Sequence, residues 1–401
     1  MNQLRLGISI LAVTVLLPVS FVAAEGARSW QLHNRLSIEY DDNIRESERN
    51  KSDSWKIANE IELLYNFNLE NTFLSFRYKP SFVWWEDRDE DSTDIHHDLD
   101  FIFNHRFSPR WALDIKDTFR VADLPEVIDD TVTVREKSDF LYNSFNATLS
   151  YRITPTSRLE FGGRYNLLRY DDSDVATRED YDMYVGGVTY RLNVLPETAL
   201  VLDGRFERIE YDDEFDRGSD IFQFGIGTEH MFSPNFLANA RVGYMTKDFN
   251  DNEIDDESQP YGDMNVTFVP SPDTRVSLGL GYSMVESDIF PYASQDRLRF
   301  SLALAHDITA RLMFQLSGSY ARAKYDVADA IPGRLAELGL DLDDFEGGTE
   351  NIYRATTRFV YRLNRSNWLE FSWIYAKLDS EEQLRRDFER NRFNVAWKTR
   401  L

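Results

Sequence analysis

A period-two alternation of apolar and polar side chains runs through most of the chain, and it constrains the fold more than any other feature. In the stretch SWKIANEIELLYNFNLE, which begins at Ser54, Trp55 and Ile57 alternate with Lys56 and later with Glu60. Successive side chains of a β-strand point to opposite faces, so this pattern predicts a strand with one apolar and one polar face. About fifteen residues is long for a globular strand but suits a tilted strand that crosses a bilayer.

The joints between these segments are alternately short and long. The long joints are mostly acidic, as in EDRDEDSTD, DDSDVATRED and KDFNDNEIDDESQ. Short turns at one rim and long polar loops at the other are typical of outer-membrane barrels. The short joints lie around Glu70, Ser108, Thr154, Leu195, Ser233, Ser271, Thr309 and Arg365.

We therefore expect an all-β fold: a closed antiparallel transmembrane β-barrel with short periplasmic turns and long acidic extracellular loops. The alternation predicts eighteen strands, an even number that places both termini of the chain at the short-turn rim. The expected strands cover residues 30–41, 54–69, 72–86, 96–107, 110–122, 138–153, 158–171, 180–193, 198–211, 219–232, 236–248, 260–270, 274–286, 296–308, 311–325, 351–364, 368–378 and 390–401.

A repeated phrase marks the strand ends near the short turns. YRITPTSRLEF begins at Tyr151, YRLNVLPETAL at Tyr190 and YRLNRSNWLEF at Tyr361. Each Tyr falls on the apolar face a few residues before a turn, where an amphipathic ring suits the headgroup level of a membrane. The histidines at 105, 230 and 306 occupy the same position of the repeat, so we expect them in this girdle rather than in catalysis. The adjacent pair at 96 and 97 is a weak signal for a metal.

The composition and the first residues predict where the protein resides. Acidic residues outnumber basic ones 69 to 45, yet Tyr, Phe and Trp make up 14% of the chain, which disfavours disorder. There is no cysteine, so disulfides are excluded. Residues 1–24 have the layout of a cleaved signal peptide with the cut after Ala24, an uncleaved anchor being the alternative. Residues 25–401 would then form the barrel in the outer membrane of a Gram-negative bacterium.

Charged side chains within the strands fall on the face opposite the apolar one and should line the lumen. They could pair with acids on neighbouring strands, among them Glu60, Glu62, Asp100, Asp114 and Asp203, and simply solvate the interior. Alternatively, a surplus of Arg and Lys could favour anions. The predicted pore-lining cations are Arg77, Lys79, Lys116, Arg164, Arg205, Arg241, Arg299, Arg354 and Arg358.

The longest extracellular loop covers residues 326–350. It contains a predicted short helix from Gly333 to about Leu340, and its leucines are apolar for a loop in water. Two interpretations are equally supported: a lid that folds over or into the pore, and simple packing on the extracellular rim.

The chain resembles the outer-membrane barrels called putative beta-barrel porin 2. The resemblance is carried by the first strand and loop, EYDDNIRESERNKSD at residues 39–53, and by the repeated long hairpins that follow. It implies a porin-like barrel associated with exopolysaccharide export, and the strand number and arginine-rich wall are also similar to those of alginate export porins. It implies no catalytic residues. The expected partners are outer-membrane lipid and lipopolysaccharide, the barrel assembly machinery, a polysaccharide and periplasmic export components, with no nucleic acid.

The expected function is accordingly a channel that exports an exopolysaccharide, and an arginine-rich constriction would favour an anionic one. The alternatives are a general diffusion porin and a surface receptor or adhesin barrel without a transport role. An enzyme would need a nucleophile within reach of a base, and no Ser or Asp pairs with a lumen-facing His in mid-strand. We therefore predict no enzymatic activity, no catalytic residue, no cofactor and no metal site.

Overall fold

The structure is a computed structural model of the 401-residue chain. It describes residues 29–87, 92–122, 138–212, 218–250, 254–287, 292–326, 347–381 and 387–401. The elements are β1 Trp30–Asp41, β2 Ser54–Asn68, β3 Thr72–Trp85, β4 Thr93–Arg106, β5 Trp111–Ala122, β6 Phe140–Thr154, β7 Ser157–Tyr170, α1 Ser173–Glu179, β8 Tyr181–Leu195, β9 Thr198–Tyr211, β10 Ser219–Ser233, β11 Phe236–Phe249, β12 Glu257–Ser271, β13 Thr274–Glu286, β14 Ser294–Thr309, β15 Leu312–Lys324, β16 Thr349–Arg362, β17 Asn367–Ser380 and β18 Phe388–Arg400.

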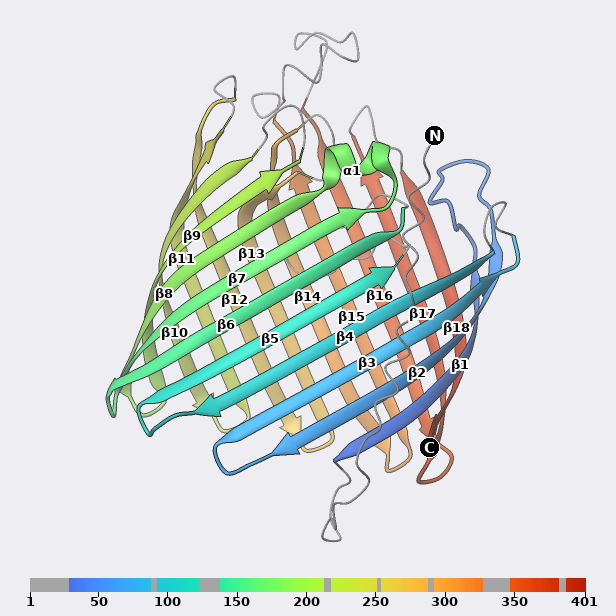
Figure 1. The fold of residues 1–401 in the computed structure, drawn as a ribbon, viewed down its shortest axis with the longest axis horizontal. Helices are drawn as coiled ribbons and strands as arrows, with labels where there is room; N and C mark the ends of the chain where they lie inside the picture. Colours follow the sequence, from blue (N-terminus) through green and yellow to red (C-terminus); the bar gives the residue numbers. More distant parts are fainter. Residues whose placement is uncertain are drawn as a thin grey trace, which may run out of the picture.

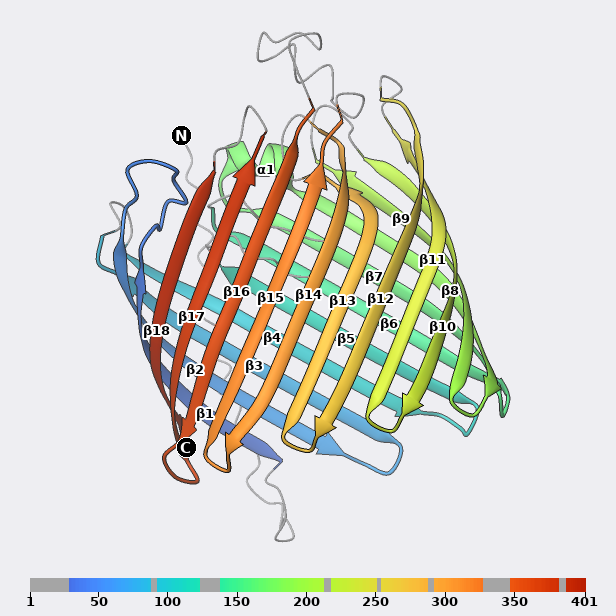
Figure 2. The same cartoon turned by 180° about the vertical axis from the view of Figure 1, so that it is seen from behind.

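The eighteen strands form one closed antiparallel barrel. Each strand pairs with its neighbours in the sequence, and β1 closes the sheet by pairing with β18, from His33 opposite Arg400 to Asp41 opposite Arg392. Figure 1 and Figure 2 show the strands inclined to the barrel axis, with short turns joining them at one end. The predicted fold class is confirmed. Within the described residues, no helix is long and apolar enough to cross a membrane.

The predicted strands agree closely with those observed. The largest differences at the start of a strand are three residues, at β4, which begins at Thr93, and at β12, which begins at Glu257. The short helix α1 was not predicted. It lies in an expected acidic loop, and Asp172 caps it by accepting hydrogen bonds from the backbone N–H groups of Asp174 and Val175. The predicted helix at 333–340 and the signal peptide at 1–24 lie outside the described residues.

The apolar face of the sheet points outward. Phe224 and Val242 on this face are 65% and 61% exposed, as expected for side chains that would contact lipid. Trp111 and Tyr151 lie opposite each other near the short turns, with ring centroids 4.4 Å apart. A polar side chain can also lie on the outer face near the short turns if it contacts a polar side chain of the neighbouring strand.

The three histidines of the repeat have such a partner. Nδ1 of His105 lies 2.8 Å from the hydroxyl of Thr72, and the same contact recurs at 2.9 Å between His230 and Thr198 and between His306 and Thr274. In each case a Thr that opens a strand faces the His directly across the ladder. These contacts give the histidines a structural role at the rim.

The segment Tyr40–Asn43, which carries the family resemblance, fastens the seam between the first and last strands. Nε of Arg390 on β18 donates to both carboxylate oxygens of Asp41 at 3.0 Å, and both side chains are almost fully buried. Asp42 accepts the backbone N–H of Asn391 at 2.6 Å. Asn43, also fully buried, donates to the carbonyl of Glu389 at 3.0 Å. The motif therefore joins residues nearly 350 positions apart, at the end where the long loops emerge.

Candidate functional site

The candidate site is the inner wall of the barrel. Residues directly opposite each other in a ladder share a face, so the register places every predicted pore-lining cation on the face opposite the apolar one. On one side of each cation, the direct partner in the ladder is Asp100 for Arg77, Asp98 for Lys79, Ile102 for Lys116, Asn146 for Arg164, Gln223 for Arg205, Gly227 for Arg241, Gly281 for Arg299, Ser319 for Arg354 and Ser372 for Arg358. Their role in transport stays a prediction.

The side of the wall around the seam, formed by the inward residues of β1–β5 and β16–β18, is called the seam wall below. Arg77 Nε donates to Asp100 at 2.6 Å, and Thr118 donates to the other oxygen of the same carboxylate at 3.1 Å. Asp98 accepts from two cations, because Lys79 lies 2.9 Å from one oxygen and Arg120 lies 3.2 Å from the other. These cations are neutralised by acids on adjacent strands.

A longer chain of charges crosses the seam. Glu370 on β17 lies 2.9 Å from Arg35 and 2.6 Å from Arg358, and it is only 5% exposed. Arg35 also lies 3.4 Å from Glu60, and Lys56 lies 2.7 Å from Glu39 on the neighbouring strand. A buried carboxylate requires such partners. The chain of contacts ties three segments that are far apart in sequence.

The opposite side, formed by the inward residues of β7–β11, is called the glycine wall. Here Gly162 faces Gly187 directly, and Gly225 faces Gly243. Tyr261 of β12 covers the second pair, because a Cβ added at Gly243 would meet its ring at 2.5 Å. A Cβ added at Gly162 would meet nothing within 4 Å. The wall is therefore covered at one glycine pair and open at the other.

On the glycine wall, the predicted cations are paired less closely, although Arg158 and Arg191 form close pairs with Glu160 at 2.7 Å and Glu229 at 2.8 Å. Arg241 Nε lies 3.2 Å from Asp203, and Arg164 lies 3.7 Å from Glu207. Arg205 forms no ion pair in the part of the chain that the structure describes, and the same holds for Lys116 on β5. Sequence reasoning did not identify Asp98, Glu207 or Glu370 as partners of the predicted cations. Their charge and alternation were visible in the sequence, but the partner depends on the register between strands.

Among the described residues, two grooves of the inner wall are lined by predicted pore cations. The seam groove has a cavity volume of about 360 Å³ and is lined by cations and carboxylates that pair with each other, including Lys56, Lys79, Glu39 and Asp98. The second groove, called the glycine basin below, has a cavity volume of about 250 Å³ and lies over the Gly162–Gly187 pair. Both grooves are open to the lumen and are of a size that suits small molecules rather than folded partners.

The extracellular mouth is narrowed by the ends of β13 and β14. The ladder between β12 and β13 stops at Gly262 opposite Tyr282, while β13 stays paired with β14 up to Glu286. Both strands can be followed in Figure 2. Beyond that point Met284 is 3% exposed and packs against Ile221, although alternation would place it outside with Tyr282.

The carboxylate of Glu286 shows how far this end leans inward. It accepts from the hydroxyls of Tyr211 on β9 at 3.3 Å and Ser219 on β10 at 3.2 Å. Along the wall, β9 and β13 are four strand spacings apart, about 19 Å. Side chains cannot span that distance, so the end of β13 must cross part of the lumen. Lys247, with a fully buried side chain, anchors it by an ion pair with Glu286 at 2.7 Å.

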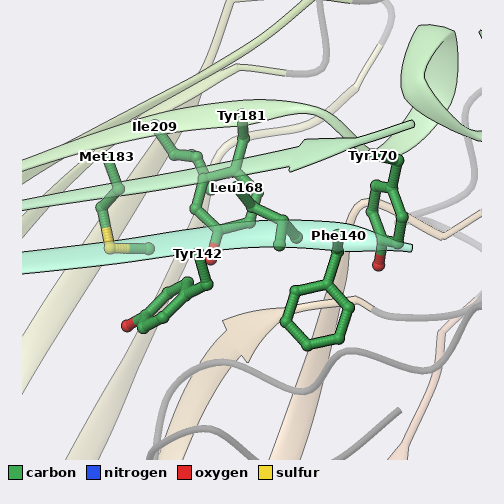
Figure 3. Packing of buried hydrophobic residues seen from close by; sticks show 7 residues of the cluster. All are labelled: Phe140, Tyr142, Leu168, Tyr170, Tyr181, Met183 and Ile209. Carbon is green, nitrogen blue, oxygen red and sulfur yellow. The ribbon is translucent and has the colours of Figure 1, made fainter. Parts of the chain in front are cut away.

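Next to this anchor, the upper part of the inner wall of β6–β9 carries an apolar cluster. Figure 3 shows its seven side chains gathered on one side of these strands. Tyr142 and Ile209 are each 1% exposed. The cluster is buried and so offers no polar surface to a solute. The polar part of the wall begins below it.

His96 and His97 point to opposite faces because they are consecutive in β4. His97 Nδ1 contacts the hydroxyl of Tyr78 at 2.9 Å on the outer face, whereas His96 lines the seam groove. A single ion cannot be held by both rings in this arrangement. Among the described residues, no group of three His, Cys, Asp or Glu is placed to hold a metal.

A closed eighteen-strand barrel with an apolar exterior and a charged, water-accessible interior defines a porin-like outer-membrane barrel. Sequence comparison agrees with this class: the model of the family Putative beta-barrel porin 2 matches residues 33–401. The chain belongs to that family. No curated protein matches the chain.

Several solved porin structures have a similar fold. OccK2 (OpdF) of Pseudomonas aeruginosa, crystallised in complex with glucuronate, is 14% identical, with 93% of this chain and 98% of that chain covered and a TM-score of 0.50. OpdK of the same species, crystallised with vanillate, is 13% identical, with the same coverage and a TM-score of 0.50. A BenF-like porin from Pseudomonas fluorescens Pf-5 is 11% identical, with 93% and 99% covered and a TM-score of 0.51. At these identities the similarity establishes the fold alone.

Proposed function

We propose that the protein is a passive outer-membrane channel for small hydrophilic solutes, with a preference for small anions. The observation that carries this proposal is an inner wall that keeps Lys116 and Arg205 outside ion pairs while most neighbouring charges are neutralised. Charged rings inside a pore lower the barrier for ions of opposite sign. The similar porins crystallised with glucuronate and vanillate hold small carboxylates, which is consistent with this proposal.

Export of an exopolysaccharide, the function first expected, has no support from the comparisons, and we favour the diffusion alternative. The inward position of Glu286 supports small solutes, because it narrows the mouth that a polymer would have to pass. Passage of a polysaccharide is tested by the same experiment that measures the size preference.

The size preference is tested in proteoliposomes by swelling rates. We expect swelling with monosaccharides and small carboxylates, and a steep fall with oligosaccharides of increasing length. Equal rates for long oligosaccharides would restore the export hypothesis. A purified, folded barrel that neither swells liposomes nor conducts ions would favour a receptor or adhesin.

The ion preference is tested in planar bilayers by the reversal potential across a salt gradient. The double variant Lys116→Gln/Arg205→Gln should shift the reversal potential away from anions without leaving any carboxylate unpaired. The matched control Arg77→Gln/Asp100→Asn removes one ion pair and no net charge, so its reversal potential should stay at the wild-type value. A wild-type channel that prefers cations would refute the anion preference.

A further inference from the structure

The glycine basin is arranged in three levels along the strands. In the middle level the open Gly162–Gly187 pair lies between Thr148 on β6 and Arg205 on β9. One step of two residues toward the long loops, about 6.7 Å along a strand, comes Arg164. The floor of the basin therefore lacks side chains, and Arg164 and Arg205 lie on two different sides of it.

The third level, one step toward the short turns, is acidic. Glu160 on β7, Thr189 on β8 and Asp203 on β9 face one another in register there. All three line the same groove as Arg164 and Arg205. The basin thus presents positive charge on its extracellular side and carboxylate oxygens on its periplasmic side.

The charges of the basin differ in how far they are already satisfied. Glu160 is paired with Arg158 at 2.7 Å, and Asp203 with Arg241 at 3.2 Å. Arg205 forms no ion pair with any described residue. Arg164 is 3.7 Å from Glu207, beyond hydrogen-bond distance, and its buried Nε has no hydrogen-bond partner. The arginines therefore have unused donors, whereas the carboxylates are neutralised and can only accept.

From this arrangement we infer that the glycine basin is a binding station for a small polyhydroxylated carboxylate, of the sugar-acid class. The inference rests on the proposed channel function and adds a site to it. The carboxylate of the solute lies between Arg164 and Arg205, which supply charge-assisted hydrogen bonds. Its hydroxyls donate to Glu160 and Asp203 and exchange hydrogen bonds with the threonines of the basin. The missing side chains at Gly162 and Gly187 make the room.

Because Glu160 and Asp203 are already paired with arginines, the basin should distinguish a sugar acid from a zwitterion. An ammonium group would be attracted to a carboxylate that lacks a cation, but Glu160 and Asp203 each have an arginine already. A hydroxyl needs only an acceptor lone pair, which a paired carboxylate retains. A sugar without a carboxylate would leave the donors of Arg164 and Arg205 unused. The station should therefore prefer a sugar acid to both an amino acid and a neutral sugar.

Single-channel recording of the full-length protein in planar bilayers tests the inference, with sodium gluconate, glucose and L-alanine as probes. We expect gluconate to reduce the chloride current in a saturating manner. Glucose lacks the carboxylate that contacts the two arginines, and L-alanine lacks the hydroxyls that donate to Glu160 and Asp203. Each should therefore need at least about tenfold higher concentration for the same effect. Current that falls linearly with gluconate and shows no saturation would overturn the station while leaving the channel function intact. Stronger block by L-alanine would replace the sugar acid by an amino acid.

Two pairs of variants separate the basin from the rest of the wall. Arg205→Gln should raise the half-saturating gluconate concentration about tenfold or more. Its control is Arg275→Gln, an exposed arginine on the inner face of β13 that forms no ion pair among the described residues, where the value should stay within about twofold of wild type. An equal effect of both variants would mean that the general field of the lumen, not the basin, attracts gluconate.

Gly162→Val tests the room in the basin without changing charge. It should abolish saturation by gluconate, because valine fills the floor, and valine suits a strand, so the barrel should still form. Gly281→Val on β13 is the control, since a Cβ there also meets nothing within 4 Å and the position does not line the basin. Saturation that survives Gly162→Val would overturn the inference. A folded wild-type protein without any conductance would refute the channel function itself, which is a different outcome.

Discussion

The seam wall and the glycine wall solve the problem of a polar interior in different ways. The seam wall fills its space with long charged side chains that neutralise each other, as Arg35 and Arg358 do around Glu370. The glycine wall leaves space at Gly162 and keeps the charge of Arg205 without an ion pair. Paired charges mainly hold strands together, whereas a charge beside open space can act on a solute. Among the cations predicted on the seam strands, Arg77, Lys79 and Arg358 belong to the first kind.

The largest effect should come from removing the edge that closes the seam. A chain truncated before Phe393 loses most of β18, and the edge of β1 from His33 to Tyr40 then has unpaired backbone groups facing lipid, at several kcal/mol each. We expect no folded barrel in the outer membrane. Fractionation and the absence of a heat-modifiable band on a gel would show it, and normal levels of the folded truncated protein would contradict it.

The next effect concerns the buried pair at the top of the seam. Arg390→Ala leaves the fully buried carboxylate of Asp41 without its partner, which should cost about 3–5 kcal/mol. The temperature at which the folded gel band converts to the unfolded one should fall clearly. The control is Arg208→Ala, which removes an exposed pair with Asp220 and should leave that temperature nearly unchanged. Similar shifts for both variants would mean that the Arg390–Asp41 pair does not stabilise the seam.

A covered glycine on the glycine wall and an open glycine on β13 should respond differently to a methyl group. A Cβ at Gly243 would lie 2.2 Å from the carbonyl oxygen of Phe224, so the backbone must shift, and Gly243→Ala should destabilise the barrel by roughly 1–3 kcal/mol. Gly281→Ala meets nothing and should be neutral or slightly stabilising. Comparing the two thermal transitions checks this, and equal stability of the two variants would show that the wall yields easily at Gly243.

The same contrast explains what the sequence could predict. Alternation assigns a face to each residue of a strand from the sequence alone, and this is why the strands and the inner position of Arg77 or Arg205 could be predicted. Ion pairs need the register, which shifts partners by several residues between strands, so Glu370 could not be matched to Arg35, 335 residues away. The inward bend at Met284 also escaped prediction, because the loss of pairing with β12 beyond Tyr282 cannot be seen in the alternation. The helix α1 had a signal in Asp172, but a single capping residue in an acidic loop is weak evidence.

The smallest predicted effect compares two buried carboxylates at the extracellular ends of the two walls. Asp41 on the seam wall has Arg390, whereas Asp180, in the loop before β8, accepts a backbone N–H from Tyr170 at 2.8 Å and forms no ion pair with a described residue. Burial raises the pKa of Asp180 above its usual value, against the weaker opposing effects of that hydrogen bond and of Arg169. A carboxyl whose pKa is higher in the folded state binds its proton more tightly there than in the unfolded chain. Stability therefore increases as the pH falls through the raised pKa and is lost again as the pH rises.

Asp180→Asn keeps an oxygen that can accept from Tyr170 and removes the charge that burial penalises. We expect this variant to be slightly more stable than the wild type near neutral pH and to lose the part of the pH dependence that this group contributes. Thermal transitions measured from neutral pH down to about the usual range of a carboxyl, near 4, would show the two curves converging as Asp180 becomes protonated. Parallel curves over that range would mean that the loop end opens to water and that burial does not penalise the charge of Asp180.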